Sequence, residues 1–158
     1  MIGPLPLRLG TAVLLGMALA AAASAEPRTP DEVVGLVTRA AAHIQVIGAP
    51  AAFADFSCRD GGFVDGELYV FCNTAEGVVL AHGGNPKLVG RNLATVRDLL
   101  GNQPVAEVDR IALAHGQGWH DYVWPNPATG LIQRKKSYVV RIDDNTVCGS
   151  GYYQPGPP

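Results

Sequence analysis

The sequence predicts an α+β domain in which a long N-terminal helix and further helices pack against a five-stranded antiparallel sheet. Three observations support this fold class. In chain order, the apolar patterns indicate a helix, two strands, a second helix and three strands. Short turns join the last three strands, which must therefore run antiparallel. Apolar residues make up 47% and charged residues 16% of the 158 residues, a balance that excludes a disordered chain.

The first 25 residues have the pattern of a secretory signal peptide. Arg8 precedes an apolar run over residues 9–23, and the small residues Ala23 and Ala25 form a cleavage pattern before Glu26. The run is shorter than the roughly 20 residues that span a bilayer, which favours cleavage over the alternative, a retained anchor. We therefore expect a signal peptide over 1–25, a domain over 26–154 and a flexible tail over 155–158. The mature protein would be periplasmic or secreted.

The first helix of the mature chain has a clear start. Thr29 can cap it, Pro30 suits its first position, and two carboxylates follow where the helix dipole favours negative charge. Apolar residues then recur at helical spacing over 33–47. A Gly-Ala-Pro sequence at 48–50 interrupts the pattern, and we expect a second short helix over 51–56.

The remaining elements follow from aromatic and β-branched runs and the turns between them. A hairpin is predicted from strands over 68–72 and 78–82, joined by a tight turn at 75–77. Irregular chain over 87–100 precedes a helix over 104–115, which ends at Gly116. The last three strands are predicted over 119–124, 136–142 and 146–153.

Charge and cysteine content limit the partners. Twelve basic residues stand against 14 acidic ones, so we expect no nucleic-acid partner. In an oxidising compartment, Cys58, Cys72 and Cys148 would form one disulfide and leave one free thiol. Cys58 with Cys72 would close a short loop, and Cys72 with Cys148 could join neighbouring strands; both pairings stay open. No Cys-x-x-Cys pair is present, and we expect neither a metal nor another cofactor.

The aromatic residues gather in two segments that also carry lysines. Both tryptophans lie in 119–127, and Tyr138 closes an Arg-Lys-Lys run over 134–138. Hydroxyl groups beside lysine ammonium groups suit a small pocket for a carboxylate ligand. The alternative is that the aromatic side chains only fill the core and the lysines are solvated.

Four segments, in the same order, resemble the single Cache domain family (Cache type 2). They are residues 63–71, residues 77–93, residues 118–127 followed by Lys135 and 137–139, and residues 147–152, and the match covers nearly all of the mature chain. The resemblance implies a PAS-like fold and extracytoplasmic sensing of small molecules, often short organic acids. Members usually precede a membrane helix and a kinase or chemotaxis module. The sequence has no second apolar run of that kind, so we expect a stand-alone sensor without its own output domain, acting with a membrane receptor or sensor kinase in trans.

The resemblance also implies binding residues. Lys135, three places before Tyr138, matches the family's recurrent lysine and would bind the ligand's carboxylate. Strand alternation would place Lys135 and Tyr138 on opposite faces unless a bulge or the strand's end intervenes, so Lys136 stays an alternative. The other residues expected to line the pocket are Tyr69, Phe71, His82, Trp119, Tyr122 and Tyr138, with Trp124 as an alternative.

We therefore predict a ligand-binding module rather than an enzyme. The second hypothesis is a periplasmic adaptor whose sheet forms a homodimer and binds no small ligand. The third is a small hydrolase using His82 and Ser150. Its motif is incomplete, because a nucleophile elbow needs glycine where residue 148 is cysteine, and no helix follows.

Overall fold

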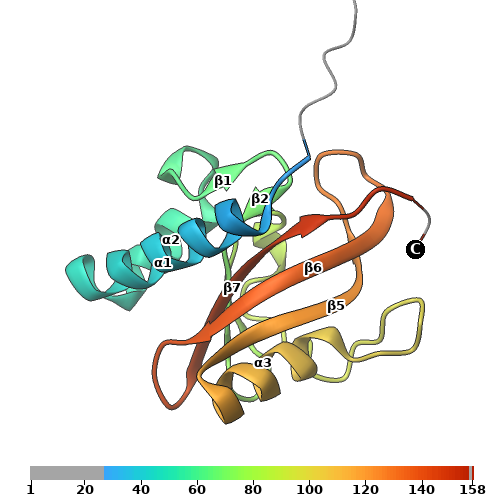
Figure 1. The fold of residues 1–158 in the computed structure, drawn as a ribbon. Coiled ribbons are helices and arrows are strands. Elements are labelled where there is room, and N and C mark those ends of the chain that lie inside the picture. The colour runs from blue at the N-terminus through green and yellow to red at the C-terminus, as the bar shows by residue number, and fades with distance from the viewer. Residues whose placement is uncertain (1–26, 157) are drawn as a thin grey trace, which may run out of the picture.

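The computed structural model describes residues 27–156 and 158, and a five-stranded antiparallel sheet lies at its centre (Figure 1). The predicted signal peptide over 1–25 lies outside the described residues. The strand order is β4-β3-β7-β6-β5, which confirms the predicted fold class and strand number. The strands are β3 (Phe71–Thr74), β4 (Val79–His82), β5 (Gln117–Pro125), β6 (Ile132–Arg141) and β7 (Thr146–Tyr153).

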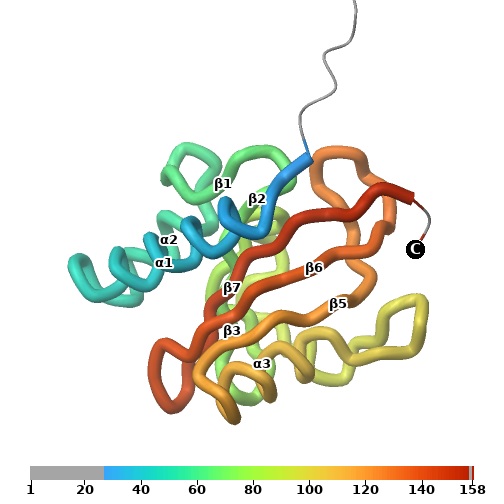
Figure 2. Tube along the Cα trace, viewed as in Figure 1, coloured from blue at the N-terminus to red at the C-terminus, as the bar shows by residue number. Residues whose placement is uncertain are grey.

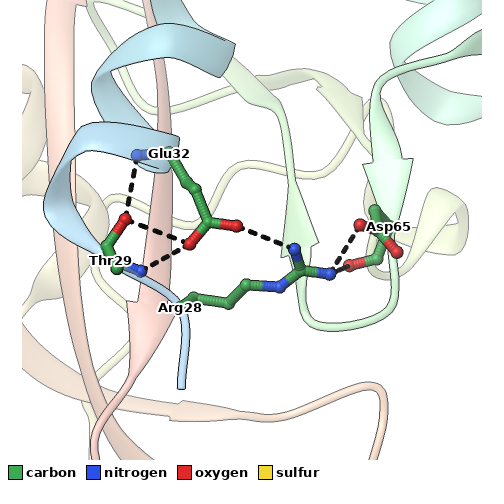
Figure 3. Close-up of polar contacts among 4 residues, drawn as sticks. All are labelled: Arg28, Thr29, Glu32 and Asp65. Carbon is green, nitrogen blue, oxygen red and sulfur yellow. Dashed lines mark hydrogen bonds and ion pairs between the residues drawn. The ribbon is translucent and has the colours of Figure 1, made fainter. Parts of the chain in front are cut away.

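The start of α1 (Pro30–Ile47) is held by a capping box. The Thr29 hydroxyl accepts a hydrogen bond from the Glu32 backbone N–H at 3.3 Å, and the Glu32 carboxylate accepts one from the Thr29 N–H at 2.7 Å (Figure 3). Arg28 pairs with Glu32 at 3.0 Å and with Asp65 at 2.5 Å. These contacts join the start of α1 to the hairpin of β1 (Val64–Asp65) and β2 (Leu68–Tyr69).

Helices cover both faces of the sheet, and each face buries its own core. On one face lie α1 and α2 (Ala49–Ser57), whose apolar side chains pack with Val70, Cys72 and Cys148. On the other face lies α3 (Pro104–His115) (Figure 2). There Val108 and Ala112 pack in one core with Phe71 and Val139. Among the described residues, no helix is both long and apolar enough to cross a membrane.

The disulfide joins Cys72 and Cys148, which lie directly opposite each other on β3 and β7. This is one of the two pairings that the cysteine spacing left open. Cys58 is the remaining thiol, and it is exposed. The bond therefore joins β3 to β7, the central strand of the sheet, on the face that α1 covers.

Two predicted strands differ from the observed ones by more than two residues at one end. The run 68–72 is divided: Leu68 and Tyr69 pair with β1, and the sheet strand begins only at Phe71. The predicted strand 136–142 begins earlier, at Ile132, because the polar run before residue 136 pairs with β5 in an unbroken ladder. Two short 3₁₀ turns, η1 (Arg59–Gly61) and η2 (Pro86–Leu88), complete the elements.

Candidate ligand-binding site

A small cavity lies on the α3 face of the sheet; we call it the inner cavity. Its volume is about 20 Å³. Side chains from β2, β3, β4, β5, β6 and the start of α3 surround it, so the cavity lies between the sheet and α3. The lining residues are Tyr69, Phe71, Asn73, Val79, His82, Leu93, Pro104, Val105, Val108, Tyr122, Trp124 and Lys135.

Lys135 is the cation of the inner cavity. Its side chain is 1% exposed, and its Nζ has no hydrogen-bond partner among the described residues. The nitrogen lies 3.9 Å from the centroid of the Tyr69 ring, 5.1 Å from that of Tyr153 and 5.5 Å from that of Phe71. Aromatic faces attract an ammonium but do not replace an anion. Burial lowers the pKa of Lys135 to about 7.

Two tyrosine hydroxyls lie in a chain beside this amine. The Tyr153 hydroxyl donates to the Pro125 carbonyl at 2.7 Å and lies 3.2 Å from the Tyr69 hydroxyl. Because Tyr153 has one proton and uses it on Pro125, Tyr69 donates to Tyr153. Burial raises the pKa of both phenols, which therefore stay neutral. The Tyr122 hydroxyl pairs with Ser137 at 3.0 Å.

His82 is a neutral hydrogen-bond donor in the wall. Its Nδ1 accepts from the Asn85 backbone N–H at 2.9 Å, which places the ring proton on Nε2. Burial, helped by the charge of Lys135, lowers the pKa of His82 to about 3. The ring therefore stays uncharged across the physiological range of pH.

The structure brings most of the predicted site residues to one cavity. Around it lie Tyr69, Phe71, His82, Tyr122, Lys135 and the alternative Trp124. Tyr153 was missed by the sequence analysis, although it lies directly opposite Lys135 in the β6–β7 pair and contacts Tyr69. Alternation along the last strand places it on the same face as Val147 and was the signal that could have found it.

The expectation that Trp119 and Tyr138 wall the same pocket is wrong. Both lie on the opposite face, where their ring centroids are 5.1 Å apart and they pack against the α1 core. The β5–β6 register runs without a bulge from Gln117 to Pro125, so strict alternation separates Tyr138 from Lys135. The alternative Lys136 also lies away from the cavity, in an ion pair with Asp121 at 3.4 Å.

The residues of the hydrolase hypothesis do not meet. The Ser150 hydroxyl donates to the Tyr69 carbonyl at 2.8 Å, and its position in β7 puts it on the same face as Cys148. His82 lines the cavity on the other face. A nucleophile and its base must lie within hydrogen-bond reach, so this pair cannot act together. In residues 27–156, no three metal-ligating side chains gather at one point.

A larger space, which we call the outer pocket, adjoins the inner cavity. Its volume is about 490 Å³. Four residues line both spaces: Tyr69, His82, Leu93 and Trp124. The rest of its wall comes from the chain between β4 and α3, from the end of β5, the start of β6 and the turn between them. It includes Asn85, Leu88, Val96, Arg97, Asp98, Leu99, Val123, Pro125, Asn126, Pro127 and Ile132.

A five-stranded sheet flanked by helices, with a buried cation in a cavity and a pocket beside it, is an arrangement that can bind a small molecule. The family model of the Cache domain matches residues 58–154, a span that contains all of the sheet. The chain belongs to the Cache domain family, whose members are extracytoplasmic sensor domains.

A curated relative and solved structures agree with this assignment. The chain is 35% identical over 86 residues to the sensor histidine kinase MctS of Rhizobium johnstonii; the match covers 54% of the chain and 18% of the kinase. The chain therefore spans about a fifth of that relative. The periplasmic sensor domain of a chemotaxis protein is 29% identical, with a TM-score of 0.64 over 79% of this chain and 90% of that one.

Two further structures share the fold. A methyl-accepting chemotaxis protein from Vibrio parahaemolyticus is 19% identical, with a TM-score of 0.70 over 78% of this chain and 86% of that one. A Cache chemosensory domain, solved to explain its recognition of carboxylic acids, is 23% identical, with a TM-score of 0.66 over 79% of this chain and 92% of that one.

Proposed function

We propose that this protein is an extracytoplasmic module that binds a small organic acid, with Lys135 as the partner of the ligand's carboxylate. One observation carries the proposal: the Lys135 amine is buried beside a cavity and has no hydrogen-bond partner among the described residues. Buried charges are normally paired, because an isolated charge in a protein interior is costly. An entering carboxylate would supply the missing partner.

The neighbouring groups suit an anionic head group. The Nε2–H of His82 is a donor at the wall, and the Tyr69 phenol is neutral. A charge-assisted hydrogen bond from lysine to a carboxylate is roughly twice as strong as a neutral one. The solved Cache domain named for carboxylic acid recognition supports the same ligand class. The two faces of the sheet separate Ser150 from His82, and the proposal is binding of the ligand without catalysis.

The proposal extends to location and partners. The predicted signal peptide would export the chain, and the Cys72–Cys148 disulfide suits an oxidising compartment. The proposed partner is a membrane receptor or sensor kinase in trans, and the similarity to a sensor kinase and to chemotaxis proteins supports a role in signalling. Cell fractionation tests the location: the protein should be recovered from the periplasm with Glu26 as its first residue. Recovery from the cytoplasm would contradict export.

A thermal-shift screen tests the binding function. The purified protein is heated with small carboxylates, the amides of the same acids, amines and amino acids. A ligand at a hundredfold excess over its Kd stabilises the folded protein by about 2.7 kcal/mol, which raises the midpoint of thermal unfolding by several degrees. We expect shifts from carboxylates alone, lost in Lys135→Met and kept in the control Lys136→Met. Equal shifts with amides, or shifts that survive Lys135→Met, would overturn the proposal.

A further inference from the structure

The inner cavity is too small to hold an organic acid. Its volume of about 20 Å³ is close to the space of one water molecule. The Lys135 Nζ lies at this cavity, so an acid that reaches the lysine can place little more than its carboxylate there. The rest of the molecule must lie in a neighbouring space.

The outer pocket is that space, and its wall is largely apolar. It shares Tyr69, His82, Leu93 and Trp124 with the inner cavity, so a ligand that spans both runs along these side chains. Three of its other apolar residues are exposed to solvent, which makes their burial by a ligand favourable. They are Val96 (41% exposed), Leu99 (67%) and Ile132 (42%).

Several polar groups in this wall are already engaged. Both carboxylate oxygens of Asp98 accept two hydrogen bonds each, from backbone N–H groups and the Asn102 amide. The Asn126 amide donates to Glu67 and Gln133, and its oxygen accepts from Ala128. A ligand's ammonium group would therefore find no free carboxylate in the wall, which disfavours amino acids.

Arg97 is the one cation of this wall. It is exposed, and its Nη1 donates to the Gly101 carbonyl at 2.6 Å. The engaged polar groups and the exposed apolar residues favour an apolar tail, whereas a dicarboxylate would have to use Arg97. The two ligand classes can be compared directly.

Resting on the proposed function, we infer that the ligand is a monocarboxylic acid with an apolar alkyl or aryl tail: its carboxylate binds Lys135 and its tail lies in the outer pocket. Each buried methylene contributes about 0.8 kcal/mol, so affinity rises about fourfold for each carbon that the tail gains inside the pocket. The rise stops when the 490 Å³ of the outer pocket is filled.

Calorimetric titration of the purified protein with straight-chain acids from propionate to octanoate tests this inference. We expect Kd to fall about fourfold per methylene. Leu99→Asp is expected to raise the Kd for octanoate at least tenfold and to leave the Kd for propionate within twofold of the wild-type value. Leu100→Asp is the matched control, because Leu100 is the exposed neighbour that does not line the pocket; it should leave both acids unchanged.

The outcomes separate the inference from the proposed function. If acids of every length bind equally and Lys135→Met abolishes their binding, the proposed function stands and the apolar tail is wrong. Suberate is the dicarboxylate with the same number of carbons as octanoate. If it binds more tightly than octanoate and Arg97→Gln removes the difference, the inference of an apolar tail is also wrong. If no carboxylate binds, the proposed function itself fails.

Discussion

The ammonium group of Lys135 lies 3.9 Å from the centroid of the Tyr69 ring, although no anion is hydrogen-bonded to it among the described residues. The Tyr69 hydroxyl also donates a hydrogen bond to the Tyr153 hydroxyl, so the hydroxyl of Tyr69 contacts Tyr153 while its ring face contacts the Lys135 ammonium. The fold therefore keeps a cation in its interior beside aromatic faces, and the negative charge of Glu67 offsets part of the cost of its burial. This arrangement costs stability in the free protein, and the carboxylate of the proposed ligand would supply the missing anion.

The first prediction concerns that cost. At pH 6, below its pKa of about 7, Lys135 is charged in both the folded and the unfolded protein. Lys135→Met removes the buried charge and should raise the free energy of unfolding of the ligand-free protein by about 1–3 kcal/mol in urea denaturation. The control Lys136→Met breaks only a surface ion pair and should change it by less than about 1 kcal/mol. A less stable Lys135→Met protein would contradict the account.

The second prediction concerns pH and affinity. Only the charged form of Lys135 attracts a carboxylate, and burial lowers its pKa to about 7 in the free protein. The Kd for hexanoate should be constant from pH 5.5 to pH 6.5 and should rise about tenfold per pH unit above pH 7, because the amine must first take up a proton. Calorimetry across this range checks the slope. A Kd that is unchanged at pH 9 would mean that the carboxylate does not meet this amine.

The third prediction concerns Asp109, which is 2% exposed on α3. Among the described residues only its Oδ1 has a partner, the Asn73 amide at 3.2 Å, and burial raises the pKa of Asp109 to about 7. The folded protein therefore holds the proton more tightly than the unfolded chain, and this contribution to stability is lost as pH rises from about 4 to about 7.

Asp109→Asn removes that loss. The variant should be more stable than the wild type at pH 8, by on the order of 1–3 kcal/mol, and the advantage should vanish near pH 4. Urea denaturation at the two pH values measures it. An advantage of the same size at both values would exclude titration of Asp109 as its cause.

The fourth prediction concerns the disulfide. Cys72 and Cys148 close a loop with a sequence separation of 76 residues, and their loss should lower the free energy of unfolding by about 2–4 kcal/mol. The double variant Cys72→Ala, Cys148→Ala is compared with Cys58→Ser, whose exposed thiol is free and whose change should leave stability within about 0.5 kcal/mol. Equal losses in the two proteins would contradict the pairing.

Local signals predicted much of the fold. The helix over 104–115 has the predicted bounds, since Pro104 fits its first turn and Gly116 ends it. The strand was predicted to begin at Lys136, four residues after the observed start of β6, because charged residues such as Arg134 and Lys135 are not typical of a strand. Only pairing with β5 and the burial of one lysine make it a strand, and both depend on residues far away in the sequence.

The site was predicted in part for the same reason. Alternation along β6 places Lys135 and Tyr138 on opposite faces of the sheet. The expectation that both line one pocket departed from this local rule and is wrong. Val105 and Val108 of α3 also line the inner cavity. Their contribution depends on which face of the sheet the helix covers, and no local pattern in the sequence predicts that face. The exposed wall of the outer pocket comes from irregular chain, where periodicity gives no guidance.

Nuclear magnetic resonance of the lysine side chains tests the central claim most directly, because it follows the Lys135 ammonium itself. The resonance, assigned by its absence from Lys135→Met, should titrate near pH 7 in the free protein. Saturation with hexanoate should move that titration upward by more than one pH unit, because the carboxylate stabilises the charged form. A lysine that titrates near 10.5 and does not respond to hexanoate would contradict the account.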